Sequence, residues 1–340
     1  MHLIIAEKHD AAKRIAQILA AGKPRSLRVA GVEAFQFDDR VVLGLSGHIV
    51  GIDYPQGYNN WQKVDCKDLI RAEIVVRPIQ EKIISALHKL GKEADRVTIA
   101  TDYDREGELI GVEALKIVEE AKPKIKADRV RYSAIVKDEI IKAFQDSGAV
   151  DYDLAASGEA RQIIDLVWGA ALTRYISLTS GRLGKEFLSV GRVQSPTLAL
   201  IVDREKEIQS FVPQPYWEIY ADLEKELRVQ HAKGRIWEKS EVDGIVSRLG
   251  PEGVIKSIET KQRIDRPPAP FDTTSFIAAA SGIGLSAANA MRIAEWLYTN
   301  GFISYPRTDN TVYPPSIDLS ALTRLFLTGA FAEEAARLLQ

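Results

Sequence analysis

The stretch Arg96-Val97-Thr98-Ile99-Ala100-Thr101-Asp102-Tyr103-Asp104-Arg105-Glu106-Gly107-Glu108 decides the fold of this chain. Residues 97–100 form a short apolar run typical of a buried strand, and residues 106–120 carry apolar side chains at helical spacing. Four carboxylates therefore occupy the turn between a strand and a helix, which is the ligand edge of an open α/β sheet. Because like charges at this spacing repel one another, a hard divalent cation is expected to neutralise them, and oxygen ligands favour Mg²⁺.

An ordinary explanation of the same acids is a solvated helix N-terminus, where the helix dipole favours Asp and Glu. This explanation accounts well for one carboxylate. It accounts less well for four carboxylates within residues 102–108, directly behind a buried strand. The metal interpretation is therefore favoured, but it needs support from a second part of the chain.

The composition is that of an ordinary globular protein. With 340 residues, 46% hydrophobic and 27% charged, the chain is long enough for two or more domains with cores of their own. The net charge of −2 excludes binding of nucleic acid through bulk positive charge, so such a site needs locally placed Arg and Lys. The single cysteine, Cys66, excludes a disulfide framework and a Cys-rich zinc module. No apolar run is long enough to span a membrane and no secretory signal is present, so we expect a cytoplasmic protein without a membrane partner.

The periodicity of apolar residues predicts a multidomain protein. Residues 1–150 alternate strand-like and helix-like segments, which predicts an α/β domain with a Rossmann-like parallel sheet. Residues 151–212 have helical periodicity, and residues 213–266 look rich in strands. Residues 267–340 are helical again, after the stiff, extended segment Arg266-Pro267-Pro268-Ala269-Pro270. The predicted strands are residues 3–6, 41–45, 97–100, 129–132, 216–229 and 253–259, and the predicted helices outside the two helical domains are residues 11–20, 79–90, 106–120, 137–144 and 240–249.

The first predicted strand ends in Glu7, which is followed by Lys8. In a doubly wound sheet, two strands that both end in acids can bring those acids to one edge. Glu7 could then face Asp102 and Asp104 as a general acid or base or as a further metal ligand, and Lys8 could hold a phosphate. Taken alone, the Glu-Lys pair is more simply explained as part of an exposed loop.

A second pattern is Phe302-Ile303-Ser304-Tyr305-Pro306-Arg307-Thr308-Asp309. A tyrosine hydroxyl is a poor nucleophile near neutral pH because its pKa is roughly 10. A guanidinium two residues on could stabilise the phenolate and hold a phosphodiester bidentately. Pro306 favours an extended backbone before it, which lets Tyr305 and Arg307 project the same way. Packing explains a lone Tyr-x-Arg more often than catalysis does.

A third pattern, Leu188-Ser189-Val190-Gly191-Arg192-Val193-Gln194-Ser195-Pro196-Thr197, opens a predicted helix. The free N–H groups of a helix N-terminus, with Arg192 and Ser195 close by, suit phosphate binding, and Gln194 could bond a base or sugar. Capping of the helix by Ser195, with Pro196 in the first turn, explains the pattern equally well.

A fourth pattern places Arg161 and Asp165 four residues apart on a predicted helix. An ion pair between residues i and i+4 is the simplest explanation. None of the four patterns fixes a function alone.

Together, and in this order along the chain, the patterns resemble one family, the type IA DNA topoisomerases. The stretches at residues 4–8 and 101–108 look like the two halves of a toprim metal centre. The matches extend over nearly the whole chain, and the Glu7-Lys8 pair looks more like the topoisomerase III and archaeal branches. The matching stretches are Ile4-Ile5-Ala6-Glu7-Lys8, residues 101–108, 160–165 and 190–196, Pro267-Pro268-Ala269-Pro270-Phe271, and residues 297–309.

The resemblance implies an ATP-independent enzyme that transiently cleaves single-stranded DNA through a 5′-phosphotyrosyl intermediate and religates it. With strand passage, such an enzyme relaxes negative supercoils or decatenates DNA. Tyr305 would be the nucleophile, and Arg307 and Lys8 would contact the scissile phosphate. Glu7 would give a proton to the leaving 3′-oxygen.

The resemblance also implies a cofactor and a partner, Mg²⁺ and DNA. The metal ligands would be Glu7, Asp102, Asp104 and Glu106. The DNA-contacting positions would be His48, Arg161, Asp165, Ser189, Val190, Gly191, Arg192, Val193, Gln194, Ser195 and Asp309.

The chain departs from the family in several places. His9 stands where many members have proline, and Gln162 replaces an arginine beside Arg161, which predicts weaker DNA contact there. Members continue well beyond the tyrosine, which implies that a chain ending at Gln340 is truncated at its C-terminus. A missing region or a partner protein would then complete the gate.

Two other functions remain open on the sequence alone. A toprim nuclease or primase-like phosphotransferase would need the acids but not Tyr305. An inactive fragment of a topoisomerase would bind DNA without cleaving it.

Overall fold

A computed structural model gives the structure of residues 1–224, 227–313 and 317–340. The chain forms two compact units. Unit 1 contains Met1–Arg192 and Pro268–Gln340, and unit 2 contains Val193–Pro267. The division into four domains drawn from the sequence stays a prediction.

A six-stranded sheet forms the centre of unit 1, in the order β2-β3-β4-β1-β7-β8. β1 lies between β4 and β7 and runs parallel to both, and β7 runs parallel to β8. β2 and β3 form a hairpin that adds antiparallel strands beside β4, so the sheet is mixed rather than the parallel sheet predicted. The strands are β1 (His2–Ala6), β2 (Arg25–Val29), β3 (Val32–Phe37), β4 (Arg40–Gly44), β7 (Arg96–Ala100) and β8 (Lys126–Arg129).

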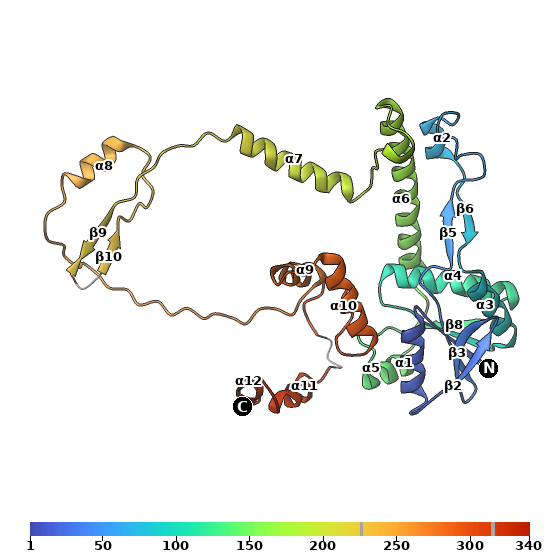
Figure 1. Cartoon of the computed structure of the whole chain (residues 1–340). Coiled ribbons are helices and arrows are strands. Elements are labelled where there is room, and N and C mark those ends of the chain that lie inside the picture. Colours follow the sequence, from blue (N-terminus) through green and yellow to red (C-terminus); the bar gives the residue numbers. More distant parts are fainter. Residues whose placement is uncertain (225–226, 314–316) are drawn as a thin grey trace. The chain divides into compact units, whose positions relative to one another are not determined.

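Helices cover both faces of this sheet, which is why its central strands are continuous apolar runs. Leu3 and Ile5 of β1 are buried in one core with residues of α3 (Glu81–Glu93) and α4 (Arg105–Ala121). Ile4 of β1 points the other way, into a second core with residues of α1 (His9–Leu19) and α5 (Lys137–Gln145). This alternation is that of a pleated strand with two buried faces. Figure 1 shows the helices α1, α3, α4 and α5 around the sheet.

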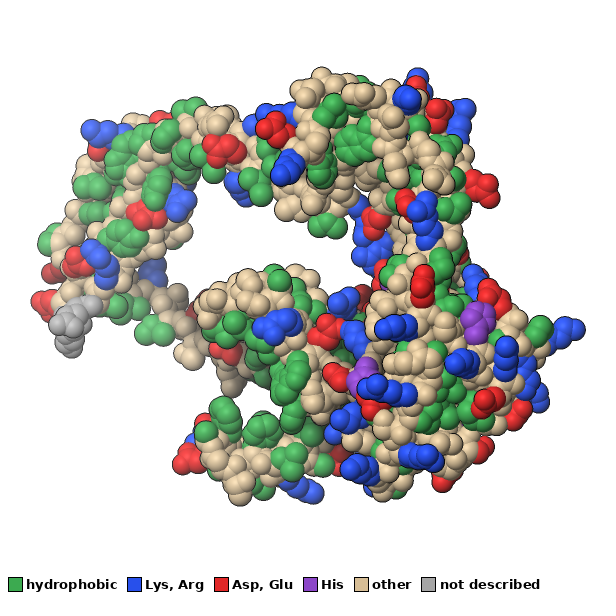
Figure 2. Space-filling view, turned by 45° about the vertical axis from the view of Figure 1, so that its right-hand side comes forward, with side chains coloured by type: hydrophobic (Ala, Val, Ile, Leu, Met, Phe, Trp, Pro, Cys, Tyr) green, Lys and Arg blue, Asp and Glu red, His purple; other side chains and the backbone are tan. Residues whose placement is uncertain are grey.

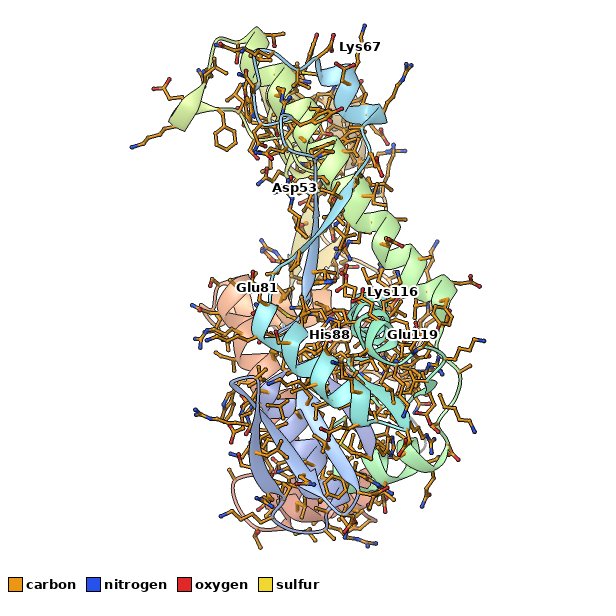
Figure 3. All side chains as sticks on the ribbon, turned by 90° about the vertical axis from the view of Figure 1, so that its right-hand side faces the viewer. Asp53, Lys67, Glu81, His88, Lys116 and Glu119 are labelled. Atoms are coloured by element: carbon orange, nitrogen blue, oxygen red, sulfur yellow. The ribbon has the colours of Figure 1, made fainter. Side chains whose placement is uncertain are left out.

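Beyond the sheet, unit 1 continues in a long helix. α6 (Tyr152–Thr179) packs against α4 and against α2 (Cys66–Arg71). The strands β5 (Val50–Asp53) and β6 (Val75–Pro78) form a separate antiparallel pair, and Figure 3 shows Asp53 at the end of β5 beside α6. The last part of the sequence also belongs to unit 1 and follows unit 2 in the chain. It forms α9 (Thr273–Gly282), α10 (Ala287–Thr299), α11 (Leu319–Arg324) and α12 (Ala332–Leu338).

Unit 2 consists of α7 (Gln194–Ser210), a hairpin of β9 (Tyr220–Leu223) and β10 (Leu227–Gln230), and α8 (Lys239–Val246). The strand predicted over 216–229 is thus two short strands. The strand predicted over 253–259 is absent from the described residues. Val254 and Ile258 are 87% and 82% exposed there, so the apolar residues of this segment pack against no core in the described part of the chain.

Two further differences from prediction concern unit 1. The strand predicted over 129–132 lies three residues too late in the sequence, because the observed β8 is Lys126–Arg129 and only Arg129 is common to both. Val130 and Tyr132 are buried in the core beside α1 and α5, which explains the apolar pattern without strand pairing. Among the described residues no single helix is long and apolar enough to cross a membrane. α9 and α10 reach that length and composition only as a pair, and they are bent by 117° relative to each other.

Candidate active site

The acids at the ends of β1 and β7 meet at one edge of the sheet. The two strands are parallel neighbours with Ala6 opposite Ala100, so Glu7 and the acidic turn leave the sheet side by side, as predicted. The backbone N–H of Asp102 donates a hydrogen bond to Glu7 Oε2 over 3.2 Å. Asp102 itself is buried, at 4% exposure.

The acidic turn is held in a tight conformation by its own polar groups. Thr101 Oγ1 donates to the carbonyl oxygen of Gly107 over 2.6 Å, and the backbone N–H of Gly107 donates to Asp104 Oδ1 over 2.7 Å. Asp104 is therefore the N-cap of α4, so the ordinary explanation of these acids holds for this residue. A Cβ on Gly107 would lie 2.2 Å from the carbonyl oxygen of Asp102, so only glycine fits this position.

Behind the turn lies a fully buried ion pair that the sequence did not reveal. Arg129 Nε donates to Glu108 Oε2 over 2.7 Å, and both side chains are 0% exposed. The Arg129 guanidinium also donates to the carbonyl oxygens of Thr101 and Asp102, each over 2.8 Å. Arg129 thereby fixes the backbone that carries the acids.

Two tyrosines of the C-terminal part of unit 1 donate to the two aspartates of the turn. Tyr305 Oη donates to Asp104 Oδ2 over 2.5 Å, and Tyr298 Oη, from α10, donates to Asp102 Oδ1 over 3.0 Å. The two tyrosine rings lie 5.1 Å apart, centre to centre. The structure therefore brings Tyr305 to the predicted acids, and Tyr298 is a residue of this site that sequence reasoning missed.

Several contacts hold the segment around Tyr305 against other parts of unit 1. The backbone N–H of Tyr305 donates to the carbonyl oxygen of Ser133 over 2.7 Å. Thr273 Oγ1, at the start of α9, donates to the carbonyl oxygen of Pro306 over 2.8 Å. Gly301 has a φ of +75°, and a Cβ there would lie 2.8 Å from the carbonyl oxygen of Ile135. These contacts fix the backbone on both sides of the tyrosine.

Burial and crowding of charge shift the pKa values of this site. Burial, followed by the charge of Asp102, raises the pKa of Glu7 to about 7. Burial also raises the pKa of Asp102. The pKa of Tyr305 is raised above its usual value of 10 by burial, by the charge of Asp102 and by the hydrogen bond to Asp104. Tyr305 is therefore held as a neutral phenol whose proton already points at a carboxylate.

Arg307 forms no hydrogen bond with Tyr305 among the described residues, so its predicted stabilisation of a Tyr305 phenolate stays a prediction. Its side chain is exposed and has no hydrogen-bond or ion-pair partner in the part of the chain that the structure describes. Arg307 lines the same cleft as Tyr305. Its charge is therefore available to an anion that enters the cleft.

The carboxylates of Glu7, Asp102 and Asp104 supply only oxygen donors, which is the ligand chemistry of Mg²⁺. Their repulsion, seen in the raised pKa of Glu7, is of the kind that a bound cation relieves. Within residues 1–224, 227–313 and 317–340, however, no three His, Cys, Asp or Glu side chains already converge closely enough to hold a metal ion. The donor set thus fits Mg²⁺, while Asp102 and Asp104 accept hydrogen bonds from the two tyrosines instead.

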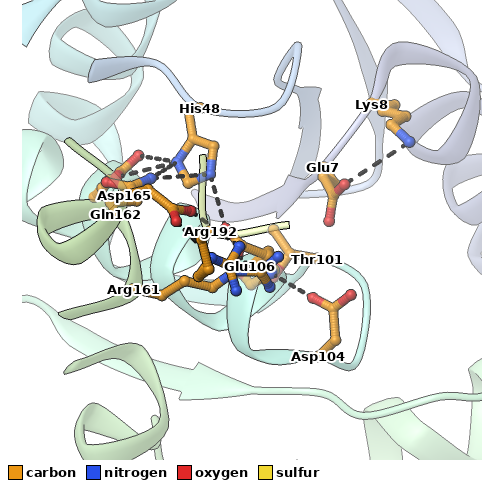
Figure 4. Close-up of polar contacts among 12 residues, drawn as sticks. Glu7, Lys8, His48, Thr101, Asp104, Glu106, Arg161, Gln162, Asp165 and Arg192 are labelled. Atoms are coloured by element: carbon orange, nitrogen blue, oxygen red, sulfur yellow. Dashed lines mark hydrogen bonds and ion pairs between the residues drawn. The ribbon is translucent and has the colours of Figure 1, made fainter. Parts of the chain in front are cut away.

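Glu106, predicted as a fourth metal ligand, belongs to a second polar cluster (Figure 4). Its Oε2 lies 3.3 Å from His48 Nε2 and its Oε1 lies 3.1 Å from Arg161 Nη1. His48 Nδ1 lies 3.2 Å from Glu113, which is the main reason that the pKa of His48 is raised. Gln162 Nε2 also lies 3.3 Å from His48. The structure thus gathers three predicted DNA-contacting or metal-binding residues into one cluster at α4 and α6.

Asp165 pairs with Arg192 rather than with Arg161, so the i,i+4 ion pair is not formed. Arg192 Nε and Nη2 donate to the two Asp165 oxygens over 2.5 and 3.0 Å. The preceding loop is fixed to α6, because the backbone N–H of Val190 donates to Thr173 Oγ1 over 2.9 Å. Gly191 follows in unit 1, and Val193, the first residue of unit 2, is the N-cap of α7 without a side-chain cap.

The N-terminus of α7 is therefore not capped by Ser195, which corrects that expectation. Gln194 and Ser195 form the first turn of α7, and Thr197 Oγ1 donates back to the carbonyl oxygen of Val193 over 2.8 Å. Ser189 lies in the loop before Val190, and Asp309 is exposed beyond Arg307. Lys8 forms an ion pair with Glu295 of α10 and lies 3.8 Å from Glu7. On the face seen in Figure 2, acidic and basic side chains are interspersed.

Comparison with known proteins identifies the family. Residues 149–340 match the family model of a DNA topoisomerase, and residues 2–135 match that of the toprim domain, a domain that typically binds Mg²⁺. DNA topoisomerase 1 of Archaeoglobus fulgidus is 50% identical over 95% of this chain and 49% of its own length. DNA topoisomerase 1 of Thermoplasma acidophilum is 45% identical over 97% of this chain and 44% of its own length.

A solved structure agrees with these relatives. Full-length topoisomerase I from Thermotoga maritima superposes with a TM-score of 0.68 at 28% identity, covering 98% of this chain and 53% of the solved one. This chain therefore spans about half the length of the proteins it matches. On the family models, the relatives and the shared fold, the chain belongs to the type IA DNA topoisomerases and carries a toprim domain.

Proposed function

We propose that this chain breaks and reseals one strand of DNA through Tyr305. The observation that carries the proposal is the 2.5 Å hydrogen bond from Tyr305 Oη to Asp104, in an acidic turn that also contacts Glu7. A nucleophile, an acceptor for its proton and a separate acid are then present at one edge of the sheet. This is the arrangement that nucleophilic catalysis at a phosphodiester requires.

In the cleavage step, Tyr305 Oη attacks the scissile phosphorus and its proton passes to Asp104. The bond from phosphorus to the 3′-oxygen breaks, and the 3′-oxygen takes a proton from Glu7. A Glu7 pKa of about 7 supports this role, because the side chain is then partly protonated at neutral pH. The 5′-phosphate remains on Tyr305, and the strand ends in a free 3′-hydroxyl.

Religation is the reverse reaction and needs no ATP, because the phosphotyrosyl bond replaces the phosphodiester bond that was broken. The 3′-hydroxyl attacks the phosphotyrosine, Glu7 takes back its proton, and Asp104 returns a proton to Tyr305. Arg307 holds the phosphate in both directions and stabilises its developing charge. Mg²⁺, held by Glu7, Asp102 and Asp104, would neutralise these acids and allow an anionic phosphate to approach them.

The DNA strand is proposed to reach Tyr305 along the cluster that contains His48 and Arg161 and along the pair of Arg192 and Asp165. These side chains are basic or able to hydrogen-bond, and the positions match those that the family resemblance assigns to DNA. Relaxation of supercoils or decatenation would also need the remainder of the gate, supplied by further sequence or by a partner chain.

The test uses the 340-residue chain with a 3′-end-labelled single-stranded oligonucleotide and Mg²⁺, denatured before electrophoresis; the label is at the 3′ end because that part of the strand would stay on Tyr305. We expect a labelled protein band with the wild type and none with Tyr305→Phe. The matched control is Tyr175→Phe, which alters an exposed tyrosine on α6 and should leave the band unchanged.

Each alternative has its own outcome in this experiment. Cleavage without attachment would indicate a toprim nuclease. Binding without cleavage would indicate a DNA-binding piece of a topoisomerase. An attached product that survives Tyr305→Phe would exclude Tyr305 as the nucleophile.

A further inference from the structure

A cleft of about 820 Å³ opens beside Tyr305, within unit 1. Tyr103 of the acidic turn and Arg131, which follows β8, line it. The tyrosine segment with Arg307 lines it too, as does Phe271. Its volume is in the range of pockets that hold a small organic molecule. The reaction itself uses only the phosphate near Tyr305, so the rest of the cleft has no assigned occupant.

Tyr103 presents an aromatic ring to this cleft. The residue is 53% exposed although its neighbour Asp102 is buried. The guanidinium of Arg131 lies over the Tyr103 ring, 5.9 Å from its centre, and Arg131 Nη2 donates to the carbonyl oxygen of Ala149 over 3.1 Å. The ring is thus supported from one side by a tethered cation while half of the residue's surface remains free to contact another flat group.

The C-terminal residues that line the cleft offer the same kinds of side chain. Phe271 is exposed and its ring meets that of Phe276 edge to face, with centres 6.2 Å apart. Arg307, which also lines the cleft, has no partner among the described residues. Aromatic rings interleaved with guanidinium groups are how proteins bind single-stranded nucleic acid, because bases stack on the rings and phosphates meet the charges.

We infer that this cleft is a nucleobase site, in which the base of the nucleotide joined to Tyr305 stacks on Tyr103. The inference rests on the proposed function. It concerns the nucleotide on the 5′-phosphate side because Tyr305, which would keep that phosphate after cleavage, lines the cleft, whereas His48 and Arg161 do not. Stacking does not distinguish one base from another, so the site would hold the covalently attached strand end whatever its sequence.

The inference is tested by removing each half of the stack. Binding of single-stranded oligonucleotides is measured on a Tyr305→Phe background, so that no cleavage occurs, and an abasic residue is moved along the oligonucleotide one position at a time. We expect Tyr103→Ala to weaken binding of the intact oligonucleotide roughly tenfold, within the range for loss of one base stack. An abasic residue at one position should weaken binding by a similar factor, and the two changes together should be no worse than either alone.

Two control variants sharpen this test. Tyr103→Phe keeps the ring and should bind like the parent, and Tyr175→Ala, which removes an exposed ring outside the cleft, should also bind like the parent. The inference is overturned if Tyr103→Ala binds normally, or if its effect multiplies with that of every abasic position. The proposed function is judged separately, by whether the protein with Tyr305 intact forms a covalent adduct.

Discussion

Removing the buried guanidinium of Arg129 should lower the stability of the chain more than removing any exposed guanidinium. Arg129→Met would leave the Glu108 carboxylate buried, with only the backbone N–H of Asp151 still donating to it, over 2.9 Å. Breaking a buried ion pair from one side costs roughly 3–5 kcal/mol, because the remaining charge is uncompensated. The carbonyl oxygens of Thr101 and Asp102 would also lose their donor, which favours the upper end of that range.

The measurement is urea and thermal unfolding followed by circular dichroism. We expect the free energy of unfolding to fall by about 3–5 kcal/mol and the melting temperature to fall by about 6–20 °C. The control is Arg337→Met, which removes an exposed i,i+4 pair with Glu333 and should cost less than about 1 kcal/mol.

A double variant separates the charge effect from lost packing. In Glu108→Gln with Arg129→Met, neither buried charge remains, and the glutamine oxygen still accepts from Asp151. The double variant should therefore lose clearly less stability than the two single variants combined. A loss below about 1 kcal/mol for Arg129→Met, or strict additivity in the double variant, would refute the reasoning.

Further predictions concern the acids, the turn and the DNA. Because the pKa of Glu7 is raised from 4.5 to about 7, the folded chain binds this proton more tightly than the unfolded chain, so in metal-free buffer stability should fall as pH rises from 4.5 to 7. Glu7→Gln should remove that part of the pH dependence, and an unchanged profile would contradict the assignment. Gly107→Ala should lower covalent adduct formation more than tenfold because its Cβ meets the carbonyl oxygen of Asp102, whereas Gly244→Ala in α8, where space is open, should leave it unchanged. Asp102→Asn combined with Asp104→Asn should weaken Mg²⁺ binding in calorimetry, and equal affinity would argue against these ligands. The logarithm of DNA affinity should fall with the logarithm of salt at a slope of about 3 or less, as contacts from the lysine and arginines proposed to meet DNA imply (Lys8, Arg161, Arg192 and Arg307), and a much steeper slope would indicate a broad cationic surface.

The central strands were predictable because strands buried on both faces consist mainly of apolar residues. Residues 3–6 are all apolar and residues 97–100 are apolar except for Thr98, which is also buried, and both faces of β1 and β7 are covered. The edge hairpin was not predictable in the same way. β2 has the sequence Arg25-Ser26-Leu27-Arg28-Val29, and an edge strand exposed to water carries charges that disguise it. The reverse error occurred at residues 253–259, where the β-branched residues Val254, Ile255 and Ile258 favour a strand but have no partner strand in the described part of the chain.

The candidate site was predicted best where topology alone brings residues together. Glu7 and the acidic turn follow neighbouring parallel strands, so their meeting needed no long-range information. Tyr298 could not be singled out, because a tyrosine at apolar spacing in a helix is usually core. It is indeed buried in a core, yet its hydroxyl reaches Asp102. The orientation of Glu106 also depends on the position of α6. No local sequence pattern predicts how close α6 lies to α4.

The four carboxylates of the turn look alike in sequence, and the fold gives them different roles. Glu108 lies beneath the turn with Arg129, and Glu106 turns to His48 and Arg161. Asp102 and Asp104 each accept a hydrogen bond from a tyrosine. Cations and phenols of the protein thus already relieve much of the repulsion that first suggested a metal. The remaining repulsion acts on Glu7. Burial and the charge of Asp102 raise the pKa of this side chain. In the proposed reaction, Glu7 is also the residue that gives a proton to the leaving 3′-oxygen.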